Sequence, residues 1–270
     1  MKPYANYKED FKQKKRRQFI SRAHRLIVFS CVTAGGIIFL LFFAKLFDVR
    51  TIEVSSPSTI PAEQVRETAW RVMQKRSLGL MRKRNILLFS SQTIRPELLD
   101  AFPRIDTIKI RRTSLHTLEI AIRERIPVGL WCLPARQTCF YYDANGIAFS
   151  QILPSSGFLY VPVNDFRDRP ISLGAPVAPD FLRNDIFDAK KILQFGDLNI
   201  SEIDIPADAY NEYHAVMREG WKILYSTDTD NRKQTNNLLV FLKEKLSKAT
   251  RANLEYVDLR IEDRIYYKER

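Results

Sequence analysis

Residues 115–131 read LHTLEIAIRERIPVGLW, and this stretch decides how the chain is divided. Between Thr117 and Glu124 polar and apolar side chains alternate, which is typical of a strand with one buried face. Pro127 follows closely, and proline is excluded from the interior of a sheet because it has no N–H to donate. The stretch therefore predicts a strand that ends just before Pro127.

The residues upstream predict a small two-layer unit. The expected elements are a strand at 49–56, a helix within 56–75, a basic irregular connector at 76–90, a second helix at 91–102, and strands at 104–112 and 117–124. Ser58 or Thr59 precedes the first helix and Pro61 lies in its first turn. Its apolar residues are spaced for one face: Val65, Ala69, Val72 and Met73. About 75 residues in this order can fold with both helices on a three-stranded sheet.

The residues downstream predict a β-rich domain with helices between its strands, so the fold class is α+β. Asn145-Gly146, between two apolar runs, predicts a tight hairpin turn with both residues at positive φ. Further strands are expected at 158–163, 200–205, 212–218 and 221–226, and helices at 179–196 and 228–249. A last strand is expected in the segment NLEYVDLRIEDRIYYKER, residues 253–270.

The N-terminal residues predict a membrane anchor. Residues 26–44 carry no charge, and at 1.5 Å per residue they span roughly 28 Å, about one hydrocarbon core. A cleaved signal peptide is the alternative, but Phe42, Phe43 and Lys45 do not resemble a cleavage site. The basic residues precede the span, which predicts a cytoplasmic N-terminus and places the rest of the chain outside.

The net charge of +12 is concentrated in the tail at residues 1–25, which holds more than half of it. A short basic tail beside a membrane is expected to bind anionic lipid and to act as a topology signal. Nucleic-acid binding by the tail is an alternative, but the anchor explains the charge without it, and no nucleic acid is expected as a partner.

Two cysteines, Cys132 and Cys139, fall in the exported part, on either side of the turn-forming residues 134–137. A hairpin would place them opposite one another, and an exported compartment is usually oxidising. We therefore predict a disulfide, with two packed free thiols as the alternative.

Three motifs connect these regions to a known family. They are Glu-Arg-x-Pro at 124–127, Asp-x-x-Gly-x-x-Phe at 143–149 and Tyr-x-Asp-Leu-Arg at 256–260. With the basic tail, the single span and the strand–helix–helix–strand–strand unit, the chain resembles the FtsQ/DivIB family of bacterial cell-division proteins, and residues 45–123 resemble its POTRA domain. His116 stands where the family usually has proline, so the sequence departs from the pattern there. The resemblance implies four regions: a tail at 1–25, a transmembrane helix at 26–44, a POTRA domain at 45–123 and a β domain at 124–270.

The alternation in the last segment predicts one strand with two faces. Val257, Leu259, Ile261, Ile265 and Tyr267 would face a core, and Asp263 interrupts that face, which suggests a bulge or bend near Glu262. A strand paired on both sides is one reading; an edge strand that accepts a partner's strand is the other.

The resemblance favours the edge, since in the family the last strand and the preceding helix bind the small bitopic proteins FtsB and FtsL. The partner-binding residues it implies are Tyr256, Asp258, Arg260, Glu262, Arg264, Ile265, Tyr266, Tyr267 and Lys268. Arg264 and Lys268 would discourage random edge pairing and favour an acidic partner. Other division proteins are expected to bind the POTRA domain, and the protein is expected at the inner membrane of the division septum.

No pattern in the sequence predicts an enzyme or a cofactor. The histidines at 24, 116 and 214 are scattered, and there is no nucleophile elbow, phosphate-binding loop or Ser-x-x-Lys set. Asp228 and Asp230 fit a solvated turn better than a calcium loop. The competing readings are a POTRA-type chaperone or transport protein that receives extended polypeptide, and a membrane-anchored hydrolase.

Overall fold

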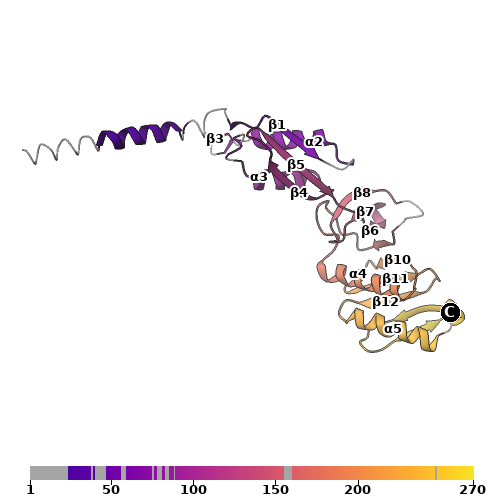
Figure 1. Cartoon of the computed structure of the whole chain (residues 1–270). Coiled ribbons are helices and arrows are strands. Elements are labelled where there is room, and N and C mark those ends of the chain that lie inside the picture. The colour runs from indigo at the N-terminus through magenta and orange to yellow at the C-terminus, as the bar shows by residue number, and fades with distance from the viewer. Residues whose placement is uncertain are drawn as a thin grey trace, which may run out of the picture. The chain divides into compact units, whose positions relative to one another are not determined.

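The computed structural model describes residues 24–37, 39, 47–55, 59–74, 76–77, 81–82, 85–87, 89–154, 160–246 and 248–270. The chain divides into two compact units (Figure 1). The first comprises residues up to 98 together with 108–121, and the second comprises 99–107 and 122–270.

Residues 24–37 form a helix, and they cover the first part of the predicted membrane span. Its apolar side chains, among them Leu26, Phe29 and Val32, are exposed. Residues 38 and 40–44 of the predicted span lie outside the described part of the chain, as do tail residues 1–23. Within the described part, no helix meets the length and apolarity needed to cross a bilayer.

The predicted elements of the first unit are confirmed. They are β1 (Thr51–Ser55), α2 (Ala62–Gln74), α3 (Ser91–Ala101), β4 (Ile105–Arg112) and β5 (Thr117–Glu124). The three strands form one sheet in the order β1-β5-β4, with β1 parallel to β5. Within the connector, β2 (Arg76–Ser77) and β3 (Met81–Arg82) form a short antiparallel pair.

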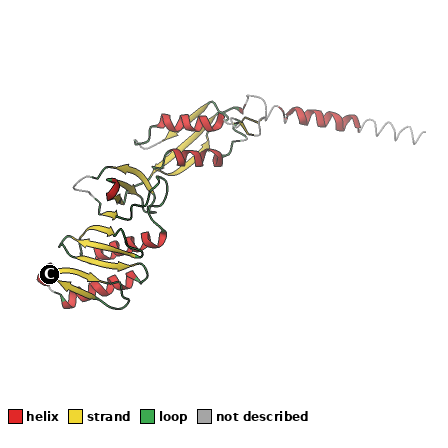
Figure 2. Ribbon diagram, turned by 180° about the vertical axis from the view of Figure 1, so that it is seen from behind, coloured by secondary structure: helices red, strands yellow, loops and turns green. Residues whose placement is uncertain are grey.

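The alternation of apolar and polar residues explains why only one face of this sheet is covered. Leu118 and Ile120 of β5 and Ile52 of β1 are buried, whereas every second residue of β1 is exposed, namely Thr51, Glu53 and Ser55. The predicted face of α2 is buried, together with Ile94 and Leu98 of α3. Both helices therefore contribute to the core that the sheet's buried face lines. Figure 2 shows the ribbons of the two helices and the three strands.

The second unit is built on a nine-stranded sheet. In chain order its strands are β6 (Gly129–Leu133), β7 (Thr138–Tyr142), β8 (Ala148–Ile152), β9 (Pro162–Asp165), β10 (Ile200–Ile205), β11 (Glu212–Met217), β12 (Lys222–Ser226), β13 (Leu254–Asp258) and β14 (Tyr266–Glu269). In space the order is β14-β13-β12-β11-β10-β9-β6-β7-β8. β9 is parallel to both β6 and β10, and β12 is parallel to β13.

Helices α4 (Asp180–Phe195) and α5 (Asn231–Lys245) pack against each other and on this sheet (Figure 1). A shorter helix, α6 (Lys248–Ala252), follows α5. The buried residues of α4 and α5 join a single core with sheet residues such as Trp131, Tyr213 and Val257. Gly196 directly follows α4, and any side chain there would collide with Leu239 of α5. This glycine therefore permits the close approach of the two helices.

The predicted two-residue turn at Asn145-Gly146 is wrong in its length and in the conformation of Asn145. Gly146 has φ +72°, but Asn145 does not have positive φ. The connection runs from residue 143 to 147, and in it the Asp143 carboxylate accepts hydrogen bonds from the backbone N–H groups of Asn145 and Ile147, both at 2.9 Å. The run predicted at 158–163 also shifts: β9 begins at Pro162, and residues 155–159 lie outside the described part.

The last segment is also corrected, since it forms two strands. β13 and β14 are antiparallel neighbours with Val257 opposite Tyr267, and residues 259–265 connect them. Asp263, where the sequence predicts a bulge, has φ +58° and lies in the turn. Because the chain reverses there, Ile261 is exposed and does not face the core with Val257 and Leu259.

Candidate functional site

Strand β14 forms one edge of the nine-stranded sheet. It pairs on one side with β13, and no described strand pairs with its other side. All four of its residues are exposed. An edge of this kind presents unpaired N–H and C=O groups to a second strand.

The turn that leads into β14 is held by the first turn of α5. Asp230 caps this helix by accepting a hydrogen bond from the Lys233 N–H at 3.0 Å. The Nε2 of the buried Gln234 donates to the carbonyl oxygens of Leu259, at 3.3 Å, and Ile261, at 2.8 Å. These contacts fix where the chain reverses.

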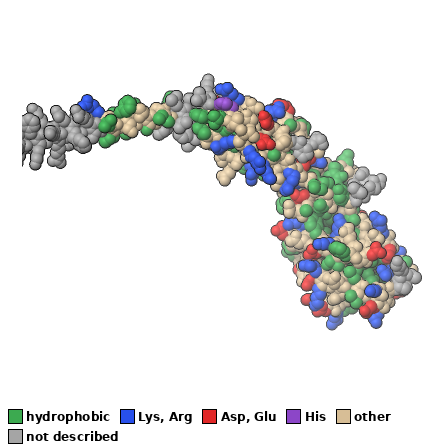
Figure 3. Space-filling model, viewed as in Figure 1, with side chains coloured by type: hydrophobic (Ala, Val, Ile, Leu, Met, Phe, Trp, Pro, Cys, Tyr) green, Lys and Arg blue, Asp and Glu red, His purple; other side chains and the backbone are tan. Residues whose placement is uncertain are grey.

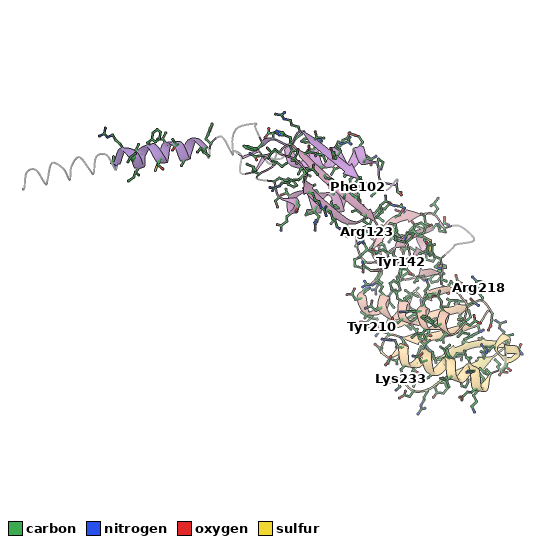
Figure 4. All side chains as sticks on the ribbon, viewed as in Figure 1. Phe102, Arg123, Tyr142, Tyr210, Arg218 and Lys233 are labelled. Atoms are coloured by element: carbon green, nitrogen blue, oxygen red, sulfur yellow. A yellow bond between two sulfur atoms is a disulfide. The ribbon has the colours of Figure 1, made fainter. Side chains whose placement is uncertain are left out.

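Lys233 adds an ion pair to the same turn, and it is labelled in Figure 4. Its Nζ lies 2.6 Å from the Asp263 carboxylate. The hydrogen bond and charge of Asp263 raise the pKa of Lys233. The pair is exposed and therefore adds little to the free energy of folding.

Arg260 joins two strands across the open face of the sheet. It donates to Asp258 at 2.7 and 3.0 Å and to Glu212 of β11 at 2.8 Å. Burial alone would raise the pKa of Asp258, but the hydrogen bonds from Arg260 outweigh it and lower that pKa. These ion pairs raise the pKa of Arg260 further above its ordinary value.

The residues predicted to bind a partner lie along one hairpin. Tyr256 and Asp258 belong to β13, the residues from Arg260 to Ile265 belong to the connection, and Tyr266, Tyr267 and Lys268 belong to β14. Most are exposed, with Tyr256, Asp258 and Ile265 partly covered. The residues predicted to bind a partner therefore lie in one region of the surface, but they form a hairpin and not the single strand that the sequence predicted.

The two cations chosen from the sequence have different surroundings. The Nζ of Lys268 lies 2.7 Å from the Glu255 carboxylate on β13, which raises the pKa of Lys268. Arg264 instead donates to the Tyr266 hydroxyl at 3.1 Å. Arg264 is therefore the cation of this pair that has no carboxylate partner among the described residues.

Sequence reasoning missed two residues that support the edge, Gln234 and Phe241. The ring of Phe241 on α5 lies 5.7 Å from the ring of Tyr267, centroid to centroid. The helical period identifies α5 as amphipathic, but it does not say which strand the helix covers. Gln234 carried no signal, because a buried glutamine and an exposed one look alike in a sequence.

The structure joins Cys132 and Cys139 by a disulfide across the β6–β7 pair, where the two residues are register partners. Both are buried, in a small apolar cluster with Leu130 on the face opposite the helices. Among the described residues no group of three or more His, Cys, Asp and Glu could hold a metal ion.

Arg125 of the Glu-Arg-x-Pro motif is mostly buried at the start of the second unit, with 14% of its side chain exposed. It donates to the carbonyl oxygen of Pro103 at 3.0 Å and forms an ion pair with Asp143. Asp143 also holds the turn between β7 and β8. Two of the three family motifs therefore meet in one contact.

Comparison with protein-family models gives one match, to the POTRA domain of the FtsQ type, over residues 47–125. Residues 47–125 are similar to an FtsQ-type POTRA domain. The match covers β1, α2, α3, β4 and β5, and it ends at Arg125. It confirms the predicted resemblance and supports an FtsQ/DivIB-family protein. A POTRA domain of this type points to a cell-division protein. No curated protein matched the chain.

Proposed function

We propose that the protein is a non-enzymatic scaffold of the bacterial cell-division complex, anchored once in the inner membrane, and that β14 binds small bitopic partners by strand addition. The FtsQ-type POTRA domain supports the cell-division part of this proposal. The proposal assigns the anchor to residues 26–44 and the septum as the place of action. The POTRA domain would contact other membrane proteins of the complex, and the basic tail would contact anionic lipid.

The observation that carries the proposal is the outer edge of β14, which pairs with no strand in the described part of the chain and is supported by α5. Main-chain hydrogen bonds to an added strand supply affinity, and alternate side chains supply specificity. Tyr266 and Tyr267 lie on opposite faces and are each about half exposed, at 46% and 47%. A partner strand could therefore contact one tyrosine on each face of the sheet.

The remaining features of the edge favour a partner that is extended and acidic. Arg264 and Lys268 flank the exposed tyrosines and are exposed themselves. Charged side chains on an edge discourage unselective pairing, and complementary charge increases the rate of encounter with the right partner.

In-cell photocrosslinking tests the proposal. A photoreactive residue would replace Ile265, Tyr266 or Tyr267 in turn, with Ala135, exposed between β6 and β7, as a control position at the other end of the sheet. We expect the three positions in and beside β14 to capture a small single-span protein and Ala135 to capture none. Capture of diverse unfolded polypeptides would support a chaperone instead, and no capture at any position would rule out this edge as the binding site.

A further inference from the structure

A second site lies beside the first half of the nine-stranded sheet, away from β14. A cavity of about 210 Å³ is lined by apolar and aromatic residues, by two lysines and by the amide of Gln194. Val128, Ala144, Tyr142 and Phe187 give it apolar and aromatic walls, and Lys190 and Lys191 of α4 bring two amines to it. No carboxylate lines it.

The aromatic floor is rigid. The rings of Tyr142 and Phe187 are stacked, with centroids 5.3 Å apart and planes 12° from parallel. Tyr142, labelled in Figure 4, packs across Gly129, where any side chain would collide with its phenol. Burial raises the pKa of Tyr142, so the hydroxyl stays protonated and can donate a hydrogen bond to an anion.

Neither lysine forms a salt bridge with any described residue, and Lys191 is exposed. Lys190 is partly buried, and desolvation lowers its pKa because the charged amine loses water. Elsewhere on this unit cations and carboxylates are interspersed, as Figure 3 shows and the ion pairs of Arg260 illustrate. The cavity therefore concentrates uncompensated positive charge.

The size and the surroundings define the ligand. The cavity is smaller than the ~300 Å³ at which pockets for drug-sized molecules begin, so it suits one side chain. Exposed apolar residues lie nearby: Phe195, four residues after Lys191 on α4, is 83% exposed, and Ile126, two residues before Val128, is 76% exposed. An anion-binding cavity near exposed apolar side chains is the pattern of a protein–protein contact.

We propose that this cavity binds the carboxylate of an acidic side chain, with apolar residues beside it, from a partner polypeptide. The carboxylate would accept hydrogen bonds from the amines of Lys190 and Lys191 and from the Tyr142 hydroxyl. Its methylene groups would contact the Phe187 ring, and the neighbouring apolar residues would cover Phe195. The site is independent of β14, so either proposal can fail alone.

Titration of the full chain in detergent tests this site. The lysines would be ¹³C-methylated, and the Lys190 and Lys191 signals assigned by replacement with arginine. The probes are N-acetyl-Leu-Glu-Phe-amide, its glutamine counterpart, and sodium acetate. We expect the Lys190 signal to shift with the glutamate peptide at an affinity about tenfold higher than with the glutamine peptide, because the ligand gains charge-assisted hydrogen bonds.

Variants test whether Lys190, Lys191 and Phe195 cause the preference for the glutamate peptide. K190M with K191M should abolish the preference for glutamate, whereas K243M with K245M, the same charge change at exposed positions of α5, should keep it. F195A should weaken the peptide but leave acetate unchanged. Equal affinity for the two peptides, or a preference that survives K190M with K191M, would overturn the proposal. Acetate binding as tightly as the glutamate peptide would overturn the polypeptide part.

Discussion

The two ends of the nine-stranded sheet are secured by different kinds of interaction. At the β6–β8 end, a disulfide joins neighbouring strands and the buried pair Arg125–Asp143 fixes a turn. At the β13–β14 end, the strands are held by one amide side chain, an aromatic contact and exposed ion pairs. A covalent link stabilises strongly and the loss of one partner from a buried ion pair is costly, whereas exposed pairs stabilise weakly. The comparison suggests that the first end supports the fold and that the second is left available for binding.

The largest effect is expected from Asp143→Ala. It removes the nearer carboxylate partner of the mostly buried Arg125 guanidinium, which keeps only the more distant Asp106 at 3.9 Å, and it removes two hydrogen bonds from the turn. We expect a loss of about 3–5 kcal/mol in the free energy of unfolding. Denaturant unfolding of the full chain, followed by the fluorescence of the buried Trp131, measures it. A loss below about 1 kcal/mol would mean that the Arg125–Asp143 pair does not stabilise the β6–β8 end.

The next effect is expected from replacing Cys132 and Cys139 together by alanine. The bond closes a loop of sequence separation 7, for which loop-closure entropy predicts about 2–3 kcal/mol. Reduction of the unaltered protein should give a similar loss. The matched comparison is Cys31→Ala, a free cysteine that should leave stability unchanged. An equal loss of stability from both replacements would show that the disulfide does not stabilise this end of the sheet.

A smaller effect of opposite sign is expected at Asp185 of α4, which lies between the two ends. Burial, partly offset by the hydrogen bond from Asn231, raises the pKa of Asp185 to about 6. A raised carboxyl pKa means that stability is full below the unfolded value of 3.8 and is lost as the pH rises through about 6.

Asp185→Asn removes this titration while keeping an oxygen that accepts from Asn231. Because Asp185 is only partly buried, we expect a gain of about 1 kcal/mol at pH 7 that disappears below pH 4. Unfolding curves at pH 4 and 7 check this. A gain that is the same at both values would show that the effect is not ionic.

The smallest effect on stability is expected from Arg264→Glu with Lys268→Glu. The Lys268–Glu255 pair is exposed, so we expect a loss of at most about 1 kcal/mol. Binding of the captured partner should weaken at least about tenfold, because both charges flank the edge strand. Trp221, which is buried just before β12, reports unfolding near this end. If stability and binding fell together, β14 would be needed for folding. The two ends of the sheet would then not differ in role.

The sequence predicted the local elements well, because each depends on residues close together in the chain. The buried face of α2 is an example: its four positions follow from helical spacing alone. The β13–β14 hairpin was not predicted, since alternation continues across residues 259–265 and only the reversal at Asp263 breaks it.

The parts of the sites that depend on distant residues could not be derived. Gln234 contacts Ile261 across 27 positions, and the cavity joins Val128 to Lys190. Neither pairing has a local pattern, because both follow from which strands α4 and α5 cover. The motifs at 124–127 and 143–149 were visible separately, but the contact between Arg125 and Asp143 became apparent only in three dimensions.

The parallel pairing of β12 with β13 has a consequence for the order of folding. The β6–β7 and β7–β8 pairs are antiparallel and close in sequence, so they require little loop closure and can form early. β13 can align beside β12 only when residues 227–253, which include α5, have crossed back over the sheet, and this closes a longer loop. The β14 edge is thus expected to be among the last parts to assemble, and pulse-labelling hydrogen exchange during refolding should show β14 protected after β7.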